Sequence, residues 1–197
     1  MKADKSHFKD IYLFHELGGS PEGTVAKLEQ VLSRGYPEVK FHRPNFPHST
    51  PFIKAEDSFH FLEEGWSSFI NPGSLLVGIS LGGLLAAKLQ EVHPEFNLSV
   101  FALVAPTSYG EVKLEQKMSN RVALYSTLAD PIIKGRCENW PELTDQAFDV
   151  PWLMHDVDMA KYACCYLISC YMRGLDMQYE VETLFPEPKD IGDEQYT

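Results

Sequence analysis

Short runs of apolar residues alternate along this chain with longer stretches of helical character. The apolar runs lie at 11–14, 39–41, 75–77, 98–105, 122–127 and, more weakly, 148–154. Stretches with the length and apolar spacing of helices lie between or after them, at 22–34, 57–69, 81–92 and 157–173. Strands that follow one another with helices between them are typical of a parallel sheet covered on both faces. The pattern therefore predicts an α/β protein with three layers, α/β/α, around a mostly parallel sheet of about six strands.

The length and charge pattern indicate one domain followed by an acidic tail. A chain of 197 residues is long enough for one domain, and no linker or repeat marks a second. The formal charge is −11, and seven acids in residues 176–197 face only Lys189. We expect residues 1–175 to form a single domain and 176–197 a loose tail. So much negative charge repels phosphate backbones and argues against binding of nucleic acid.

Other features bear on cellular location and cofactors. No apolar run approaches the roughly 20 residues that span a bilayer, and residues 1–10 lack the apolar core of a secretory signal. The four cysteines have no metal-ligand spacing, so we expect reduced core thiols in a cytoplasmic protein. Neither a G-x-G-x-x-G motif nor a phosphate loop follows a strand, which disfavours nucleotide binding.

The strongest chemical signal is the pentapeptide Gly78-Ile79-Ser80-Leu81-Gly82. It lies between a short buried strand and a helix, where a nucleophile elbow must lie. The glycines at its ends relieve crowding in so tight a turn, and the turn presents the serine hydroxyl near a helix N-terminus. The alternative is a glycine-rich turn whose serine only caps the helix.

This motif in its context resembles the α/β-hydrolase superfamily, and the chain resembles its small, lidless, esterase-like serine hydrolases from about residue 10 to 173. The resemblance implies a reduced fold without the two usual N-terminal strands and without a cap domain, with at most a short helix in 106–120. It also implies a triad in the chain order serine, acid, histidine, here Ser80, Asp130 and His155. From the residues alone there are alternatives: Asp130 is equally interpretable as a turn residue before a proline, and His155 as a surface histidine.

The resemblance extends to the groups that stabilise an oxyanion. The backbone N–H of Leu81 follows the nucleophile and is one expected donor. The segment His15-Glu16-Leu17-Gly18-Gly19 resembles the family's His-Gly loop, although Glu16 stands where glycine is usual. The Leu17 N–H is the expected second donor and the Glu16 N–H the alternative. His15 itself is also interpretable as a strand-end histidine bonded to backbone.

Aromatic residues near the same sheet edge are candidates for an acyl pocket. We expect Phe46, Tyr109 and Trp152 to line it, with core packing as the alternative for each. The expected function is therefore a serine hydrolase that cleaves a small carboxylic ester or thioester and needs no metal or organic cofactor. The alternative is a hydrolase-fold interaction protein with little turnover, in which the apolar helix 157–173 could be a homodimer face.

Overall fold

A six-stranded parallel sheet forms the centre of the computed structural model, which describes residues 6–50 and 52–186. The strand order is β2-β1-β3-β4-β7-β8, and every neighbouring pair is parallel. The strands are β1 (Asp10–Phe14), β2 (Lys40–His42), β3 (Leu75–Ile79), β4 (Ser99–Leu103), β7 (Arg121–Tyr125) and β8 (Gln146–Asp149). The predicted number and direction of the strands are confirmed.

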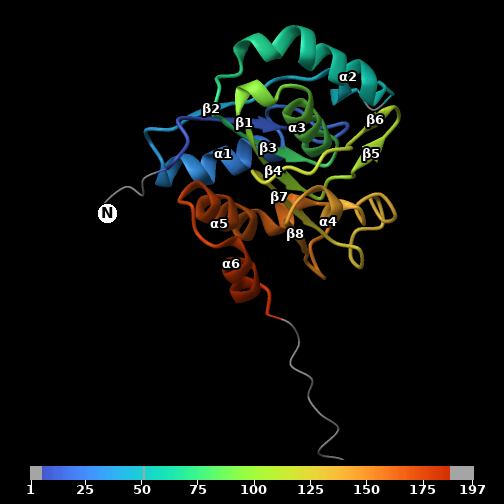
Figure 1. Cartoon of the computed structure of the whole chain (residues 1–197). Coiled ribbons are helices and arrows are strands. Elements are labelled where there is room, and N and C mark those ends of the chain that lie inside the picture. Colours follow the sequence, from blue (N-terminus) through green and yellow to red (C-terminus); the bar gives the residue numbers. More distant parts are fainter. Residues whose placement is uncertain (1–5, 51, 187–197) are drawn as a thin grey trace, which may run out of the picture.

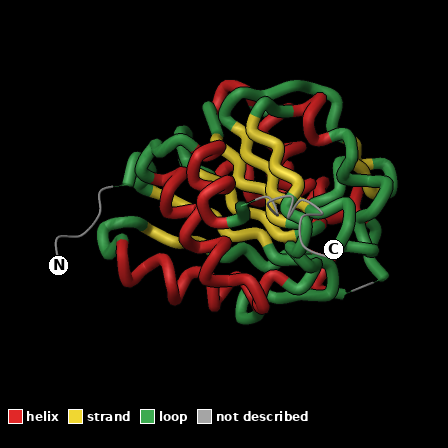
Figure 2. The backbone as a smooth tube through the Cα atoms, turned by 90° about the horizontal axis from the view of Figure 1, so that it is seen from below, coloured by secondary structure: helices red, strands yellow, loops and turns green. Residues whose placement is uncertain are grey.

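Helices cover both faces of this sheet, as expected for parallel strands that are apolar on both sides (Figure 1). Helices α1 (Thr24–Gly35) and α5 (Lys161–Met172) pack together on one face, and α2 (Ala55–Phe61) and α3 (Leu81–Val92) lie on the other. Figure 2 shows helices crossing the strands on the face seen from below. Every residue of β3 and β7 is buried, so the core lies along the central strands.

Two of the predicted helices are less regular than their apolar spacing suggests. The stretch predicted at 57–69 begins as α2, widens into a π-helical turn at Leu62–Trp66 and ends as a 3-10 turn at Ser67–Phe69. The stretch predicted at 157–173 begins as a 3-10 turn, Val157–Ala160, before α5. Further 3-10 turns lie at Pro47–Ser49 and Pro94–Phe96.

The segment 106–120 does not contain the short helix that was allowed for it. It forms a small antiparallel hairpin instead, β5 (Ser108–Tyr109) with β6 (Val112–Lys113). Gly110 at the turn has φ +59°, a conformation that glycine adopts without strain. This hairpin places Tyr109 beside the same cavity as Ser80, the residue that follows β3.

The expectation of a loose tail from residue 176 is also corrected in its first part. Asp176 caps helix α6 (Met177–Leu184) by accepting hydrogen bonds from the Gln178 and Tyr179 N–H groups. Met177 and Val181 are buried, so α6 packs on the body of the protein. Residues 187–197 lie outside the described part of the chain. One more helix, α4 (Trp140–Leu143), precedes β8.

The four cysteines behave as core residues. All are free and buried, and burial raises the pKa of Cys164 to about 12. Three of them lie on α5, and the buried side chains of this helix pack into the core. Within residues 6–50 and 52–186, we find no helix with the length and apolar character needed to cross a membrane.

Candidate active site

Ser80 sits in a strained turn between β3 and α3. Its backbone has φ +51° and ψ −120°, which residues with a Cβ rarely adopt. Two contacts hold the turn: the Ser80 N–H donates to the Leu103 carbonyl, 2.9 Å, and the Ser80 carbonyl accepts from the Gly83 N–H, 2.9 Å. The strain is therefore maintained by hydrogen bonds from both the sheet and the helix.

The glycines on either side of Ser80 are required by close backbone approach. A Cβ at Gly78 would lie 2.4 Å from the Gly82 carbonyl oxygen. A Cβ at Gly82 would lie 2.4 Å from the carbonyl oxygen of Phe14, at the end of β1. Both distances are far shorter than van der Waals contact. The turn thus has the tightness expected of a nucleophile elbow, and it also packs against the loop that follows β1.

His155 and Asp130 are in contact with each other. Asp130 follows β7 in the chain and His155 follows β8. The His155 Nδ1 lies 2.8 Å from the Asp130 Oδ2, and Asp130 is fully buried. The other carboxylate oxygen accepts from the Ile132 N–H, 3.0 Å. Because a carboxylate only accepts, the proton lies on Nδ1 and leaves Nε2 free to accept from a hydroxyl. The expected interaction between these two residues is therefore present.

The loop after β1 is held in place by two buried histidines. The Phe46 N–H donates to the His15 Nε2, 3.2 Å, so the His15 Nδ1 carries the proton and donates to the Glu16 carbonyl, 2.9 Å. The His48 Nε2 donates to the His15 carbonyl, 2.9 Å. Burial lowers the pKa of His15, and it lowers that of His48 to about 4. His15 is thus a neutral residue that shapes the loop.

The Glu16 carboxylate is folded back along its own loop. Its Oε1 accepts from the Thr24 hydroxyl at 3.1 Å. A Cβ on Gly19 would lie 2.8 Å from the Glu16 carboxylate carbon, so the absence of a side chain at Gly19 makes room for it. The carboxylate is therefore tied to the start of α1, although Glu16 also lines the cavity described next.

Two of the triad candidates, Ser80 and His155, and both oxyanion candidates meet around one cavity of about 270 Å³, with Asp130 buried behind His155. Ser80, His155, Leu81, Leu17 and Tyr109 all line it. Sequence reasoning missed four further lining residues, Pro106, Ile132, Ile133 and Arg136. The isoleucines directly follow Asp130-Pro131 in the chain, which is the one signal that could have found them. Nothing in the pattern singles out Arg136.

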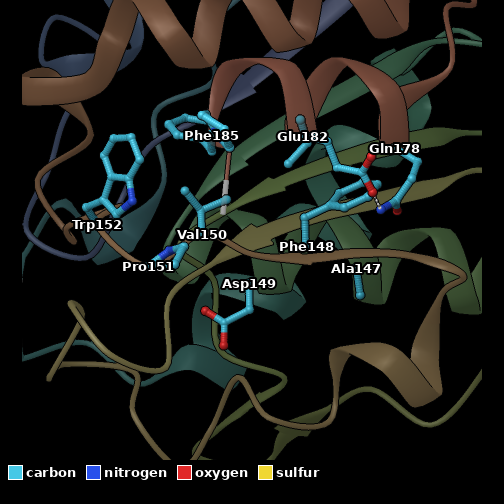
Figure 3. Close-up of a pocket in the computed structure, with 11 residues that line it drawn as sticks. Ala147, Phe148, Asp149, Val150, Pro151, Trp152, Gln178, Glu182 and Phe185 are labelled. Atoms are coloured by element: carbon cyan, nitrogen blue, oxygen red, sulfur yellow. Dashed lines mark hydrogen bonds between the residues drawn. The ribbon is translucent and has the colours of Figure 1, made fainter. Parts of the chain in front are cut away.

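Two of the aromatic residues expected to line the pocket lie elsewhere. Phe46 is 1% exposed and packs in the core, edge-on to Phe14 and stacked on His48. Trp152 is 57% exposed and lines a different pocket between β8 and α6, where it contacts Phe185 (Figure 3). Phe46 therefore supports the loop after β1 from within the core, and Trp152 follows the edge strand β8 and lies next to α6.

No protein-family model and no curated protein sequence matches this chain. Several solved structures, in contrast, are similar to it. It is similar to the mouse alpha/beta hydrolase domain-containing protein 10, with 11% identity, a TM-score of 0.63, and coverage of 91% of this chain and 92% of that one. The type II thioesterase BorB of the borrelidin biosynthetic cluster has 14% identity, a TM-score of 0.62, and coverage of 87% and 96%.

A third similar structure is MGS-MChE2, an alpha/beta hydrolase enzyme from the metagenome of lagoon sediments at Mar Chica, Morocco. It has 15% identity and a TM-score of 0.64, and the match covers 86% of this chain and 93% of that one. At such low sequence identities, the structural similarity establishes the fold alone. With its parallel sheet and strained strand-to-helix turn, this chain has the α/β-hydrolase fold.

Proposed function

We propose that the protein is a serine hydrolase that cleaves a carboxylic ester or thioester through an acyl-enzyme on Ser80. The observation that carries the proposal is the 2.8 Å contact between His155 Nδ1 and Asp130, beside a cavity that both His155 and Ser80 line. A serine hydroxyl is a weak nucleophile until a base takes its proton. The arrangement supports His155 as the base and Asp130 as the group that orients it.

In the proposed reaction, the Ser80 oxygen attacks the substrate carbonyl carbon while the His155 Nε2 takes the hydroxyl proton. Asp130 holds the imidazole in the required tautomer and stabilises its positive charge. The proton then passes to the departing alcohol or thiol as its bond to the acyl carbon breaks. Water, deprotonated by the same imidazole, releases the acid and restores the Ser80 hydroxyl.

The tetrahedral intermediate needs donors for its negative oxygen. The Leu81 N–H lies at the N-terminus of α3, where the helix dipole adds to its effect. We infer that the Leu17 N–H is the second donor, because Leu17 lines the same cavity from the loop after β1. The hydrogen bond from the Thr24 hydroxyl to the Glu16 Oε1 holds that carboxylate toward the start of α1.

A fluorophosphonate probe tests the proposal, because it forms a covalent bond only with an activated serine. We expect wild-type protein to be labelled, Ser80→Ala to remain unlabelled, and Ser108→Ala to be labelled like wild type. Ser108 is a suitable control because it neighbours Tyr109 on β5 and does not line the cavity that contains Ser80. Circular dichroism of each variant establishes that it is folded.

A folded wild-type protein that resists labelling would overturn the proposal. The protein would then be better explained as a hydrolase-fold interaction protein with little turnover. Labelling that persists in Ser80→Ala would instead place the nucleophile at another residue.

A further inference from the structure

Arg136 is a cationic residue on the wall of the cavity that contains Ser80 and His155. Its backbone is anchored on both sides: its carbonyl accepts from the Thr107 N–H, 2.6 Å, and from the Thr107 hydroxyl, 2.7 Å. Its N–H donates to the Ile133 carbonyl, 2.8 Å. The Arg136 side chain therefore projects from a backbone segment that is fixed by hydrogen bonds. This segment follows the loop that contains Asp130.

The guanidinium of Arg136 has no carboxylate partner among residues 6–50 and 52–186. Arg43 and Arg121 each pair with glutamates, whereas the guanidinium carbon of Arg136 lies 5.4 Å from the centre of the Tyr109 ring. Tyr109 lines the same cavity. Stacking on an aromatic ring orients a guanidinium while leaving its N–H donors free. In a chain of net charge −11, an unpaired arginine at this place is available to an anion.

We propose that Arg136 binds a carboxylate of the substrate, so that the preferred substrate is a short aliphatic ester carrying one negative charge. The inference rests on the proposed function. The planar guanidinium fork matches a carboxylate in geometry as well as charge. Ile132 and Ile133 line the cavity beside it, so an alkyl chain between ester and carboxylate meets apolar wall.

The size and charge of the cavity limit the substrate further. A volume of about 270 Å³ accommodates a small molecule rather than a long acyl chain. Glu16 also lines the cavity, and Asp130 lies behind His155. Arg136 balances a single negative charge on the ligand, whereas these carboxylates oppose any further one. A monocarboxylate ester therefore fits better than a doubly charged phosphate ester.

Matched pairs of esters test the inference, with the charge placed on either side of the scissile bond. Monomethyl adipate is compared with methyl 6-methylheptanoate, and 4-acetoxybutanoate with 4-methylpentyl acetate. In each pair a carboxylate is replaced by an isopropyl group of similar shape. The kcat/KM of each ester is measured by NMR for wild type, Arg136→Gln, Arg136→Lys and Lys134→Gln. Lys134→Gln removes the same charge from an exposed neighbour that is not among the described cavity-lining residues.

We expect wild type to prefer the carboxylate member of at least one pair. Arg136→Gln should reduce that preference about tenfold, which is the effect of one charge-assisted contact that remains accessible to water. Arg136→Lys should restore part of it, and Lys134→Gln should leave the ratio unchanged. Added salt should raise the KM of the carboxylate ester and leave that of its neutral counterpart unchanged.

Failure of the inference is distinguishable from failure of the proposed function. If fluorophosphonate labels Ser80 but wild type prefers the neutral ester in both pairs, the inference falls and the hydrolase proposal stands. The inference also falls if Arg136→Gln and Lys134→Gln change the ratio equally, since a general charge effect then explains it. If folded wild type neither reacts with the probe nor hydrolyses any of the esters, both fall together.

Discussion

Replacing Gly82 by alanine should damage the site through the backbone. The added Cβ would lie 2.4 Å from the Phe14 carbonyl oxygen and 2.5 Å from the His15 carbonyl oxygen. Ordinary van der Waals contact begins at 3.4 Å, so α3 and the end of β1 must separate by about 1 Å. Neither oxygen can move alone, because Phe14 is in register with Gly78 on β3 and the His15 carbonyl accepts from His48.

The size of the expected loss depends on what this displacement changes in the protein. Overpacking of a rigid core costs about 1–3 kcal/mol of stability. The separation also moves the loop that contains Leu17 away from Ser80. A misplacement of about 1 Å between reacting groups costs about 100-fold in rate. We therefore expect Gly82→Ala to lower the free energy of unfolding by about 1–3 kcal/mol and the rate of fluorophosphonate labelling by about 100-fold.

The assay combines a labelling time course with urea unfolding, and Gly35→Ala is the matched control. Gly35 is the last residue of α1, and a Cβ there meets nothing within 4 Å. Alanine at that position should raise stability by up to about 1 kcal/mol and leave labelling unchanged. Wild-type stability and a wild-type labelling rate in Gly82→Ala would refute the reasoning, because the backbone contact would then be easily relieved.

Three further changes test separate parts of the site. Asp130→Asn should slow labelling by about 10³–10⁴-fold, because an amide favours the wrong tautomer of His155; a rate near that of wild type would exclude Asp130 as the orienting acid. The pKa of His48 is about 4 in the folded protein and about 6.5 when unfolded. Its neutral form is therefore favoured by folding, and the stability it contributes is complete above about pH 6.5 and lost as the pH falls toward about 4. His48→Gln keeps a donor for the loop and should flatten this part of a urea-unfolding pH profile; an unchanged slope would contradict the assignment. Phe46→Ala should cost about 3–5 kcal/mol in urea unfolding, whereas Phe52→Ala, at a residue 91% exposed, should cost almost nothing; equal losses would contradict the packing described.

Much of the fold was predictable because its signals are local. An apolar run of strand length, followed by a stretch of helical spacing, produces the same element wherever it lies in the chain. Alternation of such elements leaves few arrangements other than a parallel sheet with helices on both faces. The turn at Ser80 was predictable for a similar reason. Only glycine tolerates the close backbone approach at Gly78 and Gly82, so the sequence carries the trace of that geometry.

The pairing of Asp130 with His155 was predictable in part. Each follows a predicted strand, and the carboxyl ends of parallel strands meet at one sheet edge. Their separation of 2.8 Å and the tautomer it imposes depend on how the two loops fold against each other. The sequence by itself therefore determined which residues are candidates, and the tertiary structure decided which of them are in contact.

The sequence did not predict contacts between residues that come from distant parts of the chain. Phe46 and Trp152 have similar side chains and similar local surroundings, yet one is buried beneath the loop after β1 and the other lines a pocket beside α6. Arg136 has no local signal at all and meets Tyr109 only because the hairpin β5–β6 folds over that edge. The sequence determined the elements and the strained turn, since periodicity and steric exclusion act between near neighbours. Only the tertiary structure decided what surrounds Ser80, because packing is a property of residues brought together through space.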